Sequence, residues 1–210
     1  MTDDRSIPQA ILERLEQAEE LKLAGKYEEA IAMLEQLLLE DPQNVSALEE
    51  IADNELSLER YDRAETAAKQ AIDLDAKSYT GEYILGFLRS HQGKWEEAIA
   101  HLRHANALKA NNPEILRCLG WALFNTGQRP QGIVTLERAL NLDHESALTL
   151  CDLGVAYLGL HNLQKAKALF LRALDLDPGN PRAKECVAAV ERFERDARTE
   201  ESRYKKQDTK

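Results

Sequence analysis

Cysteine is scarce in this chain of 210 residues, and long apolar runs are missing. The three cysteines are an odd number without close spacing, which argues against a disulfide framework. No segment approaches the apolar length that crosses a membrane, and the opening residues MTDDRSIPQA lack the apolar core of a signal peptide. We therefore expect a cytoplasmic chain with no membrane span.

The sequence also lacks the motifs that mark catalytic and metal sites. It contains no glycine-rich phosphate loop, no H-E-x-x-H, no G-x-S-x-G and no nucleophile with an evident base. His101 and His104 are the one close histidine pair, and no carboxylate or cysteine at ligand spacing joins them on that helix face. The sequence therefore predicts no enzyme activity, no metal site and no cofactor.

Aromatic residues (6%) and prolines (six) are few, and basic residues are outnumbered by acidic ones. The low proline content suits a nearly all-helical chain that forms one continuous domain. A net charge of −10 disfavours nucleic acid as a partner, because phosphate neutralisation needs a basic stripe.

The chain does contain a period of 34 residues. Cutting it after residue 10 gives five windows in one frame, 11–44, 45–78, 79–112, 113–146 and 147–180. Each window predicts a pair of amphipathic helices, and a fixed period of this length is typical of stacked helix-pair solenoids. One column of small residues comes from the first helices and one from the second, which would let the two helices of each pair approach closely. These columns are Ala18, Ala52, Gly86, Gly120, Gly154 and Ala30, Ala64, Ala98, Gly132, Ala166.

Helix ends are marked with the same regularity. Every window ends on asparagine or serine, whose side chains cap the first backbone N–H groups of a following helix. Gly25, Gly93 and Gly127 lie just past the first helix of their windows, where a left-handed C-terminal cap favours glycine. The agreement of cap chemistry with apolar periodicity strengthens the prediction of helix pairs.

The fifth window carries the spacing W-x2-L-G-x2-Y, A-x3-F, P, with leucine in place of the tryptophan. Its matching residues are Leu150, Leu153, Gly154, Tyr157, Ala166, Phe170, Ala173 and Pro178. The chain thus resembles the tetratricopeptide repeat (TPR) family. This resemblance implies an all-α, right-handed α-α superhelical solenoid of antiparallel helix pairs. We expect a lead-in over 1–10, five repeats over 11–180, a capping helix over 181–203 and a flexible tail over 204–210.

The resemblance also implies a concave groove lined by the first helices of the repeats, and with it a role as a non-catalytic adaptor. The groove would bind an extended or helical segment of a partner protein. At its centre we expect an apolar cage of four rings with two polar neighbours, and toward its N-terminal end an acidic group. These partner-binding residues are Tyr83, Phe87, Trp121 and Phe124; Arg117 and Asn125; and Glu19, Glu49 and Asp53.

The charge distribution suggests the chemistry of that partner. Residues 1–78 contain 20 acidic and 8 basic residues, whereas residues 79–210 contain 17 acidic and 19 basic residues. A ligand that matched both the acidic region and the rings would carry basic residues and a large apolar anchor.

Two other functions stay open from the sequence. The chain could self-assemble into a homo-oligomer, with an N-terminal helix or tail inserted into a neighbour's groove. Alternatively, Cys118, Cys151 and Cys186 could form a thiol or redox site, although small apolar residues on a helix face explain them more simply. We also expect an ion pair between Glu55 and Arg89, which occupy the same position in consecutive repeats.

Overall fold

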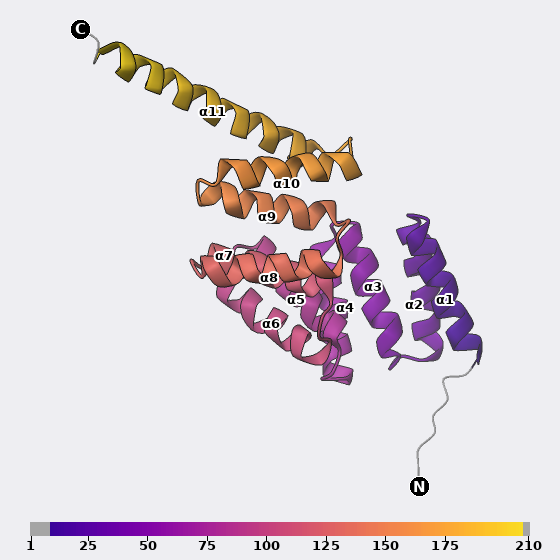
Figure 1. The fold of residues 1–210 in the computed structure, drawn as a ribbon. Helices are drawn as coiled ribbons and strands as arrows, with labels where there is room; N and C mark the ends of the chain where they lie inside the picture. Colours follow the sequence, from indigo (N-terminus) through magenta and orange to yellow (C-terminus); the bar gives the residue numbers. More distant parts are fainter. Residues whose placement is uncertain (1–8, 208–210) are drawn as a thin grey trace. The chain divides into compact units, whose positions relative to one another are not determined.

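The computed structural model describes residues 9–207, and their side chains as far as residue 195. In this part of the chain there are eleven α-helices and no strand (Figure 1). The helices divide into two compact units that meet between Ala110 and Asn111. Unit 1 contains α1 (Gln9–Leu23), α2 (Tyr27–Glu40), α3 (Val45–Ser57), α4 (Tyr61–Leu74), α5 (Tyr79–His91) and α6 (Trp95–Leu108). Unit 2 contains α7 (Pro113–Asn125), α8 (Arg129–Leu142), α9 (Ala147–Gly159), α10 (Leu163–Leu176) and α11 (Pro181–Gln207).

The chain thus forms two compact units, and its expected organisation as one continuous domain of five repeats stays a prediction. The boundary between the units falls at a connector that begins with Lys109, whereas the connectors after the other second helices begin with aspartate. In three of those connectors the aspartate side chain accepts a hydrogen bond from the backbone N–H two residues later, at 2.9–3.3 Å. Lysine offers no such acceptor, and Asn111 here has a left-handed backbone, with φ of 61°.

The predicted caps at the starts of the first helices are confirmed. Each window-ending side chain accepts a hydrogen bond from the backbone N–H three residues later, at distances of 2.9–3.2 Å. These residues are Asn44, Ser78, Asn112, Ser146 and Asn180. Because an N-cap satisfies backbone donors that the helix leaves unpaired, it sets the residue at which each first helix begins.

The turns within the helix pairs use a left-handed residue in every repeat. Gly25, Gly93 and Gly127 have φ of 73°, 72° and 86°, as predicted. Glu59 and His161 adopt the same conformation in the second and fifth repeats, with φ of 57° and 58°. A residue with a Cβ in this region carries a small conformational cost, so the turn geometry follows from helix packing even where glycine is absent.

The two small-residue columns bring the helices of each pair into close contact, as predicted. The closest approaches are at glycines, where a side chain would have no room. A Cβ on Gly154 would lie 2.4 Å from Cε1 of Phe170, and a Cβ on Gly132 would lie 2.7 Å from the backbone oxygen of Gly120. The alanines of both columns are fully buried. Each pair is therefore joined by backbone proximity and by apolar side chains beside the columns.

Helix α11 covers the end of unit 2. Ala183 and Val190 on this helix are fully buried, and Val190 packs with Ala166 and Phe170 of α10. The helix runs to Gln207, whereas we expected it to end at residue 203 and to be followed by a flexible tail. Residues 204–207 are Tyr-Lys-Lys-Gln, and lysine and glutamine favour helices without tertiary packing. Residues 1–8 of the expected lead-in and 208–210 of the expected tail lie outside the described residues.

The expected ion pair between Glu55 and Arg89 is wrong. The Glu55 carboxylate is completely buried and lies 2.9 Å from Nε of Arg63 on α4. Arg89 instead places a terminal nitrogen 2.7 Å from Glu65 on α4, and its Nε lies 3.3 Å from Glu97 on α6. Glu55 and Arg89 both lie on first helices, and each pairs with residues of an adjacent second helix. A long side chain reaches an adjacent second helix more readily than the equivalent position on the next first helix.

The contact between Glu65 and Arg89 predicts a specific acid sensitivity. Hydrogen bonds from Arg89 and Lys69 lower the pKa of Glu65 to about 2, so ionised Glu65 stabilises the folded state above its ordinary pKa, near 4.5. This contribution is lost as the pH falls from about 4.5 toward 2. We expect Glu65→Gln to lower the free energy of unfolding at pH 7 by on the order of 2 kcal/mol.

Urea denaturation of both proteins between pH 7 and pH 2 measures this effect. The stabilities of Glu65→Gln and the parent chain should converge as the pH falls through this window. A stability difference that stayed constant down to pH 2 would contradict the assignment.

Candidate interaction surface

The first helices form one layer in each unit. In unit 1, α3 contacts both α1 and α5, and in unit 2, α9 contacts both α7 and α11. Second helices of successive repeats, such as α2 and α4 or α8 and α10, have no Cα atoms within 8 Å of one another in the described residues of either unit. The repeat stack is therefore narrower on the first-helix side. The face of these helices is the surface that the resemblance identifies as the groove.

Two aromatic rings dominate this face in unit 2. Trp121 and Phe124 lie one turn apart on α7, both partly exposed, with ring centroids 6.3 Å apart and planes inclined by 15°. The guanidinium of Arg182 lies 5.8 Å from the Trp121 ring centroid, and that of Arg129 lies 5.7 Å from the Phe124 centroid. Cations over ring faces hold the rings in place and add positive charge to an apolar patch.

A buried ion-pair network supports the same surface. Arg117 on α7 is 13% exposed and contacts Asp152 on α9 at 2.9 Å and Glu114 at 2.8 Å. Arg182 of α11 contacts the other oxygen of Asp152 at 2.8 Å. Asp152 therefore joins three successive first-layer helices through its two oxygens. Arg117 is thus linked through Asp152 to Arg182, which lies over Trp121, and its expected contact with a ligand stays a prediction.

Asp152 and Arg182 were not among the residues predicted from the sequence. Arg182 occupies the second position of a sixth 34-residue window, which is the groove position of Glu114 and Leu148 in the two windows before it. Extending the frame past residue 180 would have identified it. Asp152 has no such signal, because its side chain is almost fully buried between helices. Asn125, the remaining predicted residue of α7, is exposed and donates a hydrogen bond to the Trp121 carbonyl at 2.8 Å.

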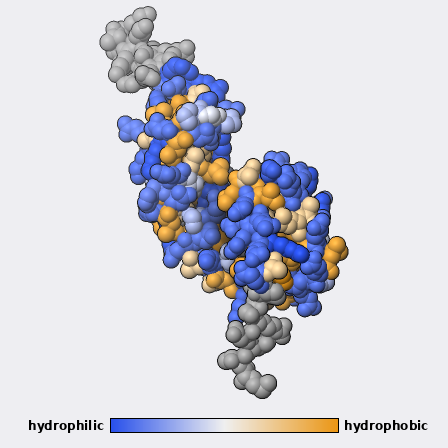
Figure 2. All heavy atoms as spheres, turned by 90° about the vertical axis from the view of Figure 1, so that its right-hand side faces the viewer, coloured by the Kyte–Doolittle hydropathy of each residue, from blue (hydrophilic) through white to orange (hydrophobic). Residues whose placement is uncertain are grey.

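The other predicted rings belong to unit 1. Tyr83 and Phe87 lie one turn apart on α5, are both partly buried, and pack against the unit 1 core. The four-ring cage thus draws two rings from each unit, and it stays a prediction. On the face that Figure 2 shows, hydrophobic residues appear as small groups among hydrophilic side chains. Small scattered apolar groups are ordinary on a protein surface and do not by themselves mark an interaction site.

The three predicted acidic residues differ in their surroundings. Glu19 on α1 is exposed. Glu49 accepts a hydrogen bond from the Ser78 hydroxyl at 2.6 Å, and burial raises the pKa of Glu49. Asp53 is bonded by Lys22 at 2.8 Å. Glu49 and Asp53 therefore present less negative charge to solvent than the sequence predicts. Of the three acidic residues, Glu19 is the exposed one.

Lys22 also contacts Glu50, at 2.9 Å, so it links α1 to α3 through two carboxylates. Burial alone lowers the pKa of Lys22, but the hydrogen bonds and charges of Asp53 and Glu50 raise it above its ordinary value overall. The lysine thus stays charged and stabilises the first-helix layer near the N-terminal end.

The histidine pair differs from its prediction. Glu82, on α5, places one carboxylate oxygen 2.7 Å from Nδ1 of His101 and the other 3.0 Å from Nδ1 of His104. This contact was not predicted, because Glu82 lies on the neighbouring helix rather than on the helix of the histidines. Within residues 9–195, no group of three histidine, cysteine or acidic side chains is arranged to hold a metal ion.

The three cysteines are free thiols. Cys118 and Cys151 are buried, and Cys186 is partly buried. Burial raises the pKa of the Cys151 and Cys186 thiols, which reduces the reactive thiolate at neutral pH. Their surroundings favour the interpretation of small apolar residues packed between helices.

Comparison with known proteins identifies the repeats. Models of tetratricopeptide repeats match residues 15–79, 91–127 and 147–180. Anaphase-promoting complex subunit 3 of Schizosaccharomyces pombe is 25% identical over 108 residues, 51% of this chain and 16% of that protein. The chain thus matches about a sixth of the length of this relative.

Solved structures share the fold. A thermophilic TPR protein of Thermus thermophilus has a TM-score of 0.69 and 21% identity over 86% of this chain and 98% of that one. YrrB, described as a TPR protein with an unusual peptide-binding site, has a TM-score of 0.57 and 22% identity over 82% of this chain and 89% of that one. Within the described residues no helix is both long and apolar enough to cross a bilayer. The all-α helix-pair fold and the three repeat matches together show that the chain belongs to the tetratricopeptide repeat family.

Proposed function

We propose that the protein is a non-catalytic interaction scaffold that binds an extended or helical segment of a partner protein on its first-helix face. The observation that carries the proposal is the partly exposed stack of Trp121 and Phe124, with an arginine over each ring. Rings held in place by neighbouring cations lose little freedom on binding, which makes them suitable anchors for an apolar side chain.

The relatives support a role in protein interaction. YrrB is described as having a peptide-binding site, and the S. pombe relative is a subunit of a protein complex. A scaffold role also fits the cysteines, because two of the thiols have raised pKa values. We therefore propose no catalytic role for Cys118, Cys151 or Cys186.

The two units offer a partner different chemistry. On unit 2 the apolar stack lies beside Arg129 and Arg182, whereas unit 1 presents exposed Glu19 on an acidic background. We propose that the apolar anchor of the ligand binds the stack. Basic residues of the same partner would be attracted by unit 1, since charges at the rim chiefly set the rate of encounter.

Trp121→Ala tests this proposal. The partner is first captured from a cell lysate with the wild-type chain, and its binding kinetics are then measured with each variant. We expect Trp121→Ala to weaken binding by about 2 kcal/mol or more, mainly through faster dissociation, because the anchor loses its ring contact.

The matched control is Trp95→Ala, which removes the other tryptophan, a partly exposed residue at the start of second helix α6. Circular dichroism checks that both variants stay folded. If folded Trp121→Ala binds the captured partner as tightly as Trp95→Ala does, the first-helix face of unit 2 is not the binding surface.

A further inference from the structure

A second kind of groove lies on the opposite side of the helix pairs, between successive second helices. One such groove lies between α2 and α4 with α3 as its floor, and another lies between α8 and α10 with α9 as its floor. Most lining residues of the first groove have an equivalent in the second groove, three repeats later in the sequence. The equivalent pairs include Glu35 and Glu137, Glu55 and Tyr157, and Arg63 and Lys165. The fold therefore builds this groove repeatedly, and side chains decide whether it is open.

In unit 1 the groove is largely filled by its own charges. Arg63 extends across it to Glu35, at 2.9 Å, and lies 2.9 Å from the buried carboxylate of Glu55. The remaining space is about 240 Å³. Because Arg63 is held by both carboxylates, this groove offers little to a partner.

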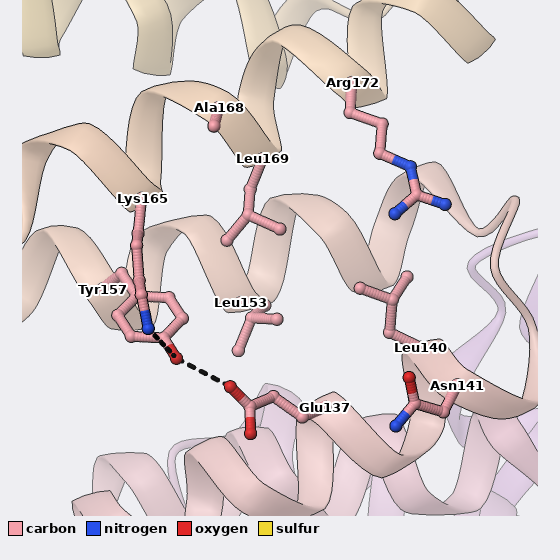
Figure 3. Close-up of a pocket in the computed structure, with 9 residues that line it drawn as sticks. All are labelled: Glu137, Leu140, Asn141, Leu153, Tyr157, Lys165, Ala168, Leu169 and Arg172. Carbon is pink, nitrogen blue, oxygen red and sulfur yellow. Dashed lines mark hydrogen bonds between the residues drawn. The ribbon is translucent and has the colours of Figure 1, made fainter.

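In unit 2 the corresponding groove is open, with a volume of about 520 Å³ (Figure 3). Tyr157 replaces the floor carboxylate, donates a hydrogen bond to Glu137 at 2.7 Å, and accepts one from Lys165 at 3.4 Å. The lysine ammonium also lies 4.7 Å from the centre of the tyrosine ring. These three side chains close one end of the groove and leave its middle free.

The middle of the unit 2 groove is apolar. Leu140 of α8, Leu153 of α9 and Leu169 of α10 line it, and Ala168 leaves room at its edge. The corresponding unit 1 positions of Leu169 and Ala168 are Ala67 and Thr66. A volume of this size is within the range of known ligand sites and holds an aliphatic side chain with part of its backbone.

The other end of the groove carries a cation. Arg172 is exposed, and its guanidinium donates one hydrogen bond, to the His144 carbonyl at 2.8 Å. Four of its five N–H donors are not used by this bond, and a planar guanidinium suits a carboxylate. The charged residues of the groove are Lys165, Arg172 and Glu137, which gives an excess of one positive charge.

We propose that the groove between α8 and α10 is a second docking site, which binds an acidic segment of a partner protein through an aliphatic side chain. The aliphatic side chain packs among Leu140, Leu153 and Leu169, and an adjacent carboxylate pairs with Arg172. Charge complementarity favours an acidic segment over a basic one. This site is separate from the stack of Trp121 and Phe124 and does not depend on the function proposed for that stack.

The probe is a fluorescein-labelled peptide, Gly-Leu-Glu-Leu-Glu-Gly, titrated into the full chain while fluorescence anisotropy is measured. Two further peptides replace either both glutamates by lysine or both leucines by serine. We expect the Leu-Glu peptide to bind at least fivefold more tightly than the lysine peptide or the serine peptide. Its affinity should fall as salt is added. Amide NMR signals of α8, α9 and α10 should shift during the titration.

Two variants of exposed residues should weaken binding of the Leu-Glu peptide at least fivefold. Arg172→Glu reverses the charge, and Ala168→Phe fills the groove. Thr66→Phe, at the corresponding position of the unit 1 groove, is the matched control and should leave the affinity unchanged. The proposal is overturned if the Leu-Glu peptide fails to bind, if it binds no better than the lysine peptide, if folded Arg172→Glu and Ala168→Phe retain full affinity, or if Trp121→Ala abolishes binding.

Discussion

Phe170→Ala is expected to lower the free energy of unfolding of unit 2 by about 3–5 kcal/mol. Phe170 is fully buried, and it occupies the space left by the missing side chain of Gly154 on the paired helix. It also packs with Ala166 and with Val190 of α11, so that its loss opens a cavity where three helices meet. The backbone is held close by the small-residue columns and cannot collapse readily into this space.

Urea denaturation followed through the fluorescence of Trp121, the one tryptophan of unit 2, measures the effect. Phe193→Ala is the matched control, because Phe193 on α11 is 57% exposed and its removal leaves no cavity. We expect this control to change stability by less than about 1 kcal/mol. Equal losses for the two variants would show that Phe170 is not the residue that joins α9, α10 and α11.

Asp152→Ala is expected to cost about 3–5 kcal/mol of unfolding free energy. Removing this carboxylate leaves the guanidinium of Arg117, which is 13% exposed, with Glu114 as its remaining ion-pair partner. It also releases Arg182, which lies over Trp121. Breaking one side of a buried pair is costly because the remaining charge keeps its desolvation penalty and loses part of its compensation.

The control for this variant is Arg182→Ala. The Arg182 side chain is 44% exposed and can be solvated, so we expect its removal to cost less than about 1 kcal/mol. Thermal and urea denaturation of both variants measure the difference. If Asp152→Ala were as stable as Arg182→Ala, the buried contact to Arg117 would not contribute to the stability of unit 2.

The helix pairs were predictable because their signals are local. The capping side chains of Asn44 and Ser78 act within three residues, and the left-handed turns at Gly25 and Gly93 depend on the conformation of one residue. The small-residue columns recur at a fixed spacing, so the close pairing of the two helices in each repeat was also predictable from the sequence. The division between Ala110 and Asn111 was not predicted, because the 34-residue period continues through it without a break.

Part of the candidate site was predictable for the same reason. The spacing of Trp121 and Phe124 on one helix places both rings on one face, and the structure shows them stacked. Arg117 was assigned to that face as a ligand contact, but its side chain turns to Asp152 on the next first helix. Its role as a ligand contact stays a prediction, and its ion pair with Asp152 could not be predicted without the position of the neighbouring helix.

The repeat period and the ends of the helices, to within a few residues, follow from local patterns in the amino-acid sequence. The partners of long charged side chains instead depend on how the helices pack: Glu55 with Arg63, Arg89 with Glu65, and Glu82 with two histidines. The packing also determines which groove between second helices is open. This difference arises because the repeat period specifies backbone positions, whereas a long side chain can reach several adjacent helices. Such a side chain pairs where burial, charge and distance together are most favourable.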